Sequence, residues 1–238
     1  MATLFISDLH LDGRSPESIE RFETFIRRYG LTADAVYILG DLFEAWVGDD
    51  DTDPAMKPVI EGLAALAKAG VPCSIMHGNH DFLIGRRFAL ATGCRLLGDY
   101  ETIELHGERV LLTHGDLLCT DDVRYMQLRT MLRDPAWQRD FLAKPLAERK
   151  AIANELRRAS LADSATKAES IMDVNQGTVV ETMQRFGVQR LLHGHTHRPA
   201  VHSLTIDGRP AERIVLDAWH EHGYVLAWDE EGYRVELI

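Results

Sequence analysis

The chain has 238 residues, of which 45% are hydrophobic and 26% are charged, and its formal net charge is −11. This composition is typical of a soluble globular protein with a full core, and the acidic balance argues against general nucleic-acid binding. No run reaches the roughly 18 apolar residues of a membrane-spanning helix, and the first residues lack the pattern of a signal peptide. Three cysteines without paired spacing predict reduced thiols in a cytoplasmic protein.

The first third of the chain alternates predicted strands with predicted helices. Short apolar runs at residues 3–7, 35–39 and 71–76 predict strands, and the segments between them have helical spacing. This alternation indicates a parallel sheet, in which ligands bind at the carboxyl ends of the strands. Three polar residues follow those ends: Asp8, Asp41 and Asn79.

The rest of the chain follows a different pattern. Residues 102–105 and 109–113 predict a hairpin, and residues 121–185 predict helix throughout, with breaks at two prolines. A strand is expected again at 190–192, and two further hairpins close the chain. We therefore expect one domain over 1–238, with 121–185 as a helical insertion within it.

Five short segments each follow a predicted strand and carry side chains that can bind a metal. In an extended chain, residues i and i+2 lie on the same face, so such a pair can reach one centre. A set of carboxylates, imidazoles and an amide suits Mn²⁺, Fe²⁺ or Zn²⁺, and a carboxylate can bridge two metals. The segments carry Asp8 and His10, then Asp41, then Asn79 and His80, then His114, then His195 and His197.

At these same segments the chain resembles the calcineurin-like metallophosphoesterase superfamily. The resemblance implies an α/β fold, a double β-sheet sandwich flanked by helices, with two metals that activate a water for attack on phosphorus. It also implies that one metal is held by Asp8, His10, Asp41 and His197. The second metal would be held by Asp41, Asn79, His114 and His195.

Residues 5–11, 37–50 and 193–200 extend the resemblance to the UDP-2,3-diacylglucosamine hydrolases of lipid A biosynthesis. The resemblance implies hydrolysis of a pyrophosphate to UMP and 2,3-diacylglucosamine 1-phosphate, with Mn²⁺ as the metal. That family most often has arginine at position 80, where this chain has His80. A histidine could hold phosphate oxygens or donate a proton to the leaving group, with Asp81 orienting the ring.

The predicted insertion is basic within an acidic protein. Residues 124–167 hold ten Lys and Arg against five Asp and Glu, set among apolar helix faces. These faces could form a groove for acyl chains or simply pack the insertion onto the body. By resemblance, the residues expected to contact substrate are Asn79, His80, Asp122, Tyr125, Arg157, Ser160, Lys167 and His195.

A basic amphipathic insertion also predicts peripheral attachment of a cytoplasmic monomer to an anionic inner-membrane surface. We expect the acidic loop at residues 49–53 to be solvated. Two rival functions stay open at this point. One is a general metal-dependent phosphodiesterase acting on nucleotides, and the other is a metal-bearing scaffold without catalytic activity.

Overall fold

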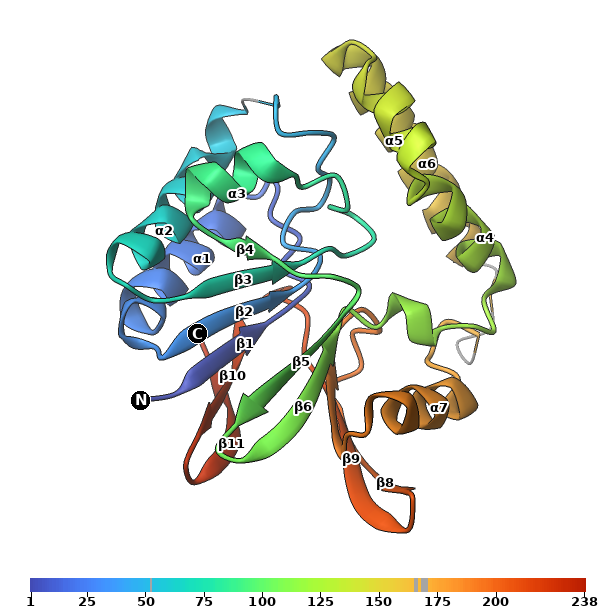
Figure 1. Cartoon of the computed structure of the whole chain (residues 1–238). Helices are drawn as coiled ribbons and strands as arrows, with labels where there is room; N and C mark the ends of the chain where they lie inside the picture. The colour runs from blue at the N-terminus through green and yellow to red at the C-terminus, as the bar shows by residue number, and fades with distance from the viewer. Residues whose placement is uncertain (52, 165–166, 168–170) are drawn as a thin grey trace.

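The computed structural model describes residues 1–51, 53–164, 167 and 171–238, and two β-sheets organise them (Figure 1). The first sheet has the order β11-β10-β1-β2-β3-β4. Its strands are β1 (Thr3–Ile6), β2 (Ala35–Leu39), β3 (Cys73–Met76), β4 (Arg95–Leu96), β10 (Tyr224–Asp229) and β11 (Gly232–Leu237). The second sheet has the order β5-β6-β7-β9-β8. Its strands are β5 (Tyr100–Leu105), β6 (Glu108–Thr113), β7 (Arg190–His193), β8 (Ala200–Ile206) and β9 (Arg209–Val215).

Strands β1, β2, β3 and β4 run parallel, as the alternating pattern predicted for the first three. Three helices cover the outer face of this sheet (Figure 1). They are α1 (Pro16–Arg28), α2 (Lys57–Lys68) and α3 (Arg86–Thr92). Short 3₁₀ helices occur at Gly30–Thr32, Pro54–Met56 and Asp116–Leu118. Because parallel strands end at the same edge, the loops after β1, β2 and β3 meet there.

The two sheets pack face to face around a shared apolar cluster. Phe5, Leu39 and Met76 come from the first sheet, and Val110 and Leu192 come from the second. All five side chains are fully buried. The α/β double-sheet sandwich expected from the sequence is therefore confirmed.

Four longer helices follow the second sheet's first hairpin: α4 (Val123–Leu132), α5 (Pro135–Leu142), α6 (Leu146–Ser164) and α7 (Gln176–Phe186). Helices α4, α5 and α6 form an arm that rises away from the sheets, whereas α7 packs beside the second sheet (Figure 1). The two proline breaks are confirmed. Continuous helix up to residue 185 is wrong, because the described residues 171–175 are not helical. In the described part of the chain, no helix has both the length and the apolar character needed to cross a membrane.

Candidate active site

The residues predicted to bind metals lie beyond the carboxyl ends of strands from both sheets. Asp8 and His10 follow β1, Asp41 follows β2, and Asn79 follows β3. From the second sheet, His114 follows β6, and His195 and His197 follow β7. Strand β6 pairs with β7 in parallel, so the last two loops also meet.

Backbone strain is concentrated at these positions. Among the described residues, seven that are not glycine have positive φ, and two of them lie in hairpin turns. L-residues rarely adopt this conformation, and it persists where the surrounding structure enforces it, often at functional sites. The other five are all predicted ligands: Asp8 (φ 55°), His10 (48°), Asp41 (51°), His195 (67°) and His197 (52°).

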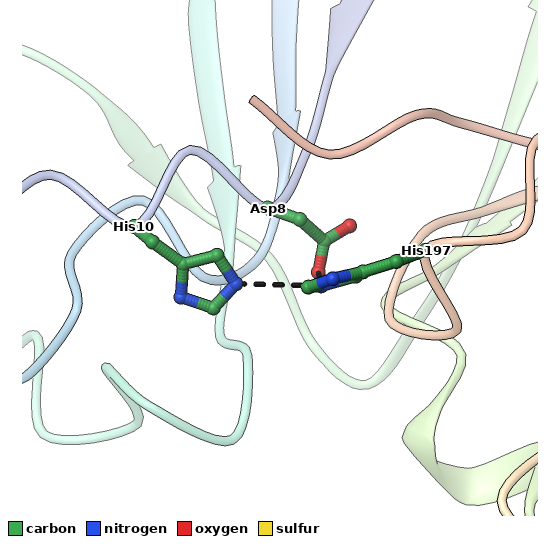
Figure 2. Close-up of side chains that lie close together, drawn as sticks. All are labelled: Asp8, His10 and His197. Carbon is green, nitrogen blue, oxygen red and sulfur yellow. Dashed lines mark hydrogen bonds and ion pairs between the residues drawn. The ribbon is translucent and has the colours of Figure 1, made fainter. Parts of the chain in front are cut away.

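One group of possible ligands is formed by Asp8, His10 and His197, whose ligand atoms all lie within 4.8 Å of one another. The Nε2 atoms of the two histidines are 3.4 Å apart, and His197 Nε2 is 3.4 Å from Asp8 Oδ1. Figure 2 shows the two rings directed toward each other beside the carboxylate. Two ring nitrogens and a carboxylate in this arrangement are suitable ligands for one divalent cation.

A second group is formed by Asp41, His114 and His195, again within 4.8 Å. His114 Nδ1 is 2.8 Å from the carbonyl of Leu39, which can only accept, so Nδ1 carries the proton. Metal-binding histidines usually donate their other N–H in this way. His114 Nε2 then faces Asn79 Oδ1 at 3.0 Å and Asp41 Oδ2 at 3.6 Å.

Asp41 lies between the two groups, since its Oδ2 is also 3.9 Å from His10 Nε2. Burial alone would raise the pKa of Asp41, but His114, His80 and His10 lower it below its usual value. Burial, together with the charge on His114, lowers the pKa of His195 to about 4. His195 is therefore neutral at pH 7, with a lone pair available to a cation. Two buried carboxylates, Asp8 and Asp41, beside the neutral imidazole of His195 fit a site for divalent metals.

Two glycines allow the ligand loops to approach closely. A Cβ at Gly78 would lie 2.0 Å from Asp41 Oδ1, and one at Gly194 would lie 2.1 Å from Asp8 Oδ2. Any side chain at either position would displace a predicted ligand. The glycines that directly precede Asn79 and His195 therefore have a steric cause.

His80 lies beside the first group, with its ring 4.9 Å from that of His10. We expected Asp81 to orient this ring, but the structure shows otherwise. The Asp81 carboxylate accepts from the backbone N–H groups of Leu42 (2.7 Å) and Gly78 (2.8 Å), and so ties two ligand loops together. His80 Nδ1 is instead 2.9 Å from the carbonyl of Glu44 and donates to it.

Some of the residues predicted to contact substrate lie near the second group of possible ligands. Asp122 caps α4 by accepting from the N–H of Tyr125 (3.0 Å) and pairs with Lys167 Nζ (2.6 Å). The Tyr125 ring lies 5.9 Å from that of His195. Arg157 on α6 forms an ion pair with Glu44 beside the first group. Ser160 is exposed on α6, and its contact with substrate stays a prediction.

The acidic loop is not simply solvated, so that expectation is wrong. Asp49 accepts from the N–H groups of residues 85, 87 and 88 and so caps α3. Asp50 pairs with Arg149 and Asp51 with Lys150, both on α6. The only signal in the sequence was the opposite charge of two distant segments, which does not specify a pairing.

Comparisons with known proteins indicate the family of this chain. The family model of calcineurin-like phosphoesterases matches residues 1–199. A UDP-2,3-diacylglucosamine hydrolase of Enterobacter sp. (strain 638) is 50% identical over 238 residues, which cover 100% of this chain and 98% of that protein. A protein of the same name from Cellvibrio japonicus (strain Ueda107) is 51% identical over 226 residues, covering 95% and 94%. A solved archaeal phosphodiesterase aligns over the whole of both chains with a TM-score of 0.49 and 15% identity, too distant to bear on the chemistry. From the family model and these full-length relatives, the chain belongs to the calcineurin-like phosphoesterase family.

Proposed function

We propose that the protein hydrolyses the pyrophosphate bond of UDP-2,3-diacylglucosamine, giving UMP and 2,3-diacylglucosamine 1-phosphate in lipid A biosynthesis. The observation that carries the proposal is the 50% identity over the whole chain to hydrolases of that name. The geometry supports it, because Asp41 belongs to the second group of possible ligands and its Oδ2 also lies 3.9 Å from His10 Nε2 of the first. Phosphoryl chemistry at such a site needs two metals a few ångströms apart, and a shared carboxylate permits that spacing.

The proposed metals are two Mn²⁺ ions. Asp8, His10, Asp41 and His197 would hold one, and Asp41, Asn79, His114 and His195 would hold the other. Two carboxylates, one amide oxygen and four imidazoles suit Mn²⁺ better than a thiolate set would. When bound, such ions supply Lewis acidity and a water of lowered pKa.

His80 is the proposed phosphate or leaving-group contact. Its Nδ1–H donates to the carbonyl of Glu44, so Nε2 is the atom free to face substrate. Burial lowers the pKa of His80, and the ring is neutral before substrate binds. A phosphate beside Nε2 would favour the protonated ring, which could then donate to a phosphate oxygen or to the leaving group. Asp81 would act through the loop backbone that it holds.

The arm is proposed to bind the rest of the substrate. Arg157 and Lys167 supply positive charge beside the two groups, and Asp122, Tyr125 and Ser160 complete the proposed contacts. Apolar side chains continue from the ligand loop into the arm, where the Phe82 ring lies 6.4 Å from the Trp137 ring, which in turn stacks on the buried Phe141. Acyl chains are proposed to bind beside the half-buried rings of Phe82 and Trp137, because burying each CH₂ contributes about 0.8 kcal/mol.

The direct test is incubation of the purified protein with UDP-2,3-diacylglucosamine and Mn²⁺ in ¹⁸O-water, followed by mass spectrometry. UMP and the diacyl sugar phosphate are the expected products. Label in UMP would mean attack on the uridine-side phosphorus, and label in the lipid product would mean attack on the other. Absence of product would overturn the proposal. Turnover of bis(p-nitrophenyl) phosphate or cyclic nucleotides that equals or exceeds turnover of the UDP-lipid would favour the general phosphodiesterase.

The protein is further proposed to act as a monomer attached to the anionic inner face of the cytoplasmic membrane. Its substrate would be a lipid, and the arm supplies both positive charge and exposed apolar side chains. Val123 is 60% exposed and Met131 is 45% exposed.

A further inference from the structure

Glu44 lies between the first group of possible ligands and the arm. It follows β2 in the loop that contains Asp41, and its backbone N–H donates to the carbonyl of Leu11 (3.1 Å). Its side chain is only 12% exposed. A carboxylate this buried needs partners, and the structure places one beside each of its oxygens.

The first partner is His10. Glu44 Oε2 lies 3.0 Å from His10 Nδ1, a buried nitrogen that makes no hydrogen bond with the described residues. A carboxylate favours the proton on the facing nitrogen, which leaves the Nε2 lone pair free. That Nε2 is the atom directed toward His197 and Asp41.

The second partner is Arg157 of the arm, whose guanidinium forms an ion pair with Glu44 Oε1. Docking of α6 does not require this pair, because Arg149 already binds Asp50 and the carbonyl of Val47. A guanidinium held near two metal ions would be repelled by them, and a carboxylate between offsets that repulsion. The carbonyl of Glu44 meanwhile holds His80.

We propose that Glu44 is a positioning residue with two separable tasks, orienting His10 for its metal and holding Arg157 where the substrate's phosphate binds. The second task rests on the proposed function, whereas the first concerns metal binding alone. One carboxylate thereby couples a metal ligand on the body to a substrate-binding cation on the arm.

The first task is tested by titrating Mn²⁺ into the metal-free full-length protein and its variants by calorimetry. Glu44→Ala should weaken one of the two sites by about 10- to 100-fold, the usual cost of losing such a support. Glu44→Gln should bind Mn²⁺ nearly as the wild type does, because an amide oxygen in the place of Glu44 Oε2 can accept from His10 Nδ1. The control is Glu61→Ala, which removes an exposed carboxylate on α2. Wild-type affinity in Glu44→Ala would overturn this task, and so would equal weakening by both Glu44 variants.

The second task is tested with saturating Mn²⁺ and the UDP-lipid. Glu44→Gln should raise KM by about 3- to 10-fold with little change in kcat, the pattern of lost ground-state binding. In an Arg157→Ala background the same substitution should have no further effect on KM, since contacting residues are not additive. An unchanged KM, or additive effects, would overturn the second task. A wild-type protein inactive on this lipid would instead refute the proposed function and leave the calorimetric result standing.

Discussion

Asn79 and His80 are neighbours in one loop, yet they contact different groups. Asn79 Oδ1 faces His114, whereas the His80 ring is held by Glu44. We therefore expect Asn79→Ala to weaken one metal site. His80→Ala should keep both metals and lower kcat by about 10²-fold or more, as loss of a proton donor does. Metal content by mass spectrometry and turnover under saturating Mn²⁺ would separate the two effects.

A suitable control is His202→Ala, since His202 is an exposed histidine on strand β8. It should leave both metal content and turnover unchanged. His80 also lies within 4.8 Å of ligand atoms on His10 and Asp41. Loss of a metal from His80→Ala would therefore place this histidine among the ligands.

Asp116 is a buried carboxylate that sequence patterns did not reveal. It accepts from Tyr125 Oη (2.7 Å) and Arg129 Nε (2.6 Å), so it fixes the base of the arm beside the site. Burial alone would raise its pKa, but His114 and Arg129 hold that pKa well below the ordinary value. Folding thus favours the charged form of Asp116. Its contribution to the free energy of unfolding is fully present above the unfolded-state pKa and is lost as the pH falls toward the folded-state pKa.

The metal-free wild type should therefore lose stability between pH 5 and pH 2, with Asp116 contributing up to about 1.4 kcal/mol per pH unit below the unfolded pKa near 4. Asp116→Asn lacks this contribution. It should be less stable at pH 7 by about 1–3 kcal/mol and depend less on pH in the acid range. Urea unfolding at several pH values, followed by circular dichroism, measures both. If the free energies of unfolding of the wild type and Asp116→Asn fell equally with pH, Asp116 would not be a source of the acid instability.

The metal ligands could be predicted because each follows an apolar strand, and parallel strands bring their carboxyl ends together. Glu44 and Asp116 could not, because Arg157, Tyr125 and Arg129 lie on helices that only the tertiary fold places beside these carboxylates. Asp81 shows the same limit. Its position next to His80 suggested a contact with the ring, but the chain turns after Gly78 and directs the carboxylate to backbone amides.

At the scale of elements, the buried side chain of Arg149 helps to hold α6 on the body. Arg149 is 2% exposed and donates to Asp50 Oδ1 (2.8 Å), to the carbonyl of Val47 (2.6 Å) and to that of Lys144 (3.1 Å). Hydrogen bonds of charged groups contribute about 1.5–3 kcal/mol. Arg149→Ala should therefore loosen the arm, increase amide exchange in α4–α6 and raise KM for the lipid.

The matched control is Arg139→Ala, which removes an exposed arginine from α5. Hydrogen exchange measured by mass spectrometry should show no change in that variant. If Arg149→Ala also leaves the exchange of α6 at the wild-type rate, apolar packing rather than this arginine holds the arm.

The bounds of helices and strands could be predicted closely where the apolar periodicity extends over the whole element and a glycine or proline marks its end. Strand β2 occupies residues 35–39 as predicted, and helix α1 ends two residues before Gly30. Strand β4 has two residues, too few to show any period. The break before α7 was not predicted, because no proline or glycine lies between residues 146 and 176 to mark it.

At the scale of the molecule, charge is unevenly distributed in a way that bears on membrane binding. The arm is basic although the whole chain carries −11. Anionic lipid attracts each nearby Lys or Arg by about 1 kcal/mol, within a Debye length of about 8 Å at physiological salt. We expect the protein to float with phosphatidylglycerol vesicles at low salt and to dissociate as salt rises.

Reversal of two exposed arm charges, Arg139→Glu with Arg158→Glu, should abolish flotation. Charge reversal on α1 and α2, Arg28→Glu with Lys68→Glu, should weaken flotation less, although the net charge of the protein changes equally. No flotation of the wild type at moderate salt would count against peripheral attachment, as would equal losses in both variants.

Because the ligand loops come from both sheets, bound metal would act as a cross-link between chain segments that are distant in sequence. Asp8, His10, Asp41 and Asn79 belong to the first sheet's loops, and His114, His195 and His197 to the second's. A ligand at 100 times its Kd stabilises the folded state by about 2.7 kcal/mol, and two sites would add to each other. Removal of metal by a chelator should therefore lower Tm by several degrees in calorimetry, and re-addition of Mn²⁺ should restore it. Bound metal would thus hold the loops of the two sheets together at one edge of the sandwich, so that the Tm of the protein depends on the concentration of available metal.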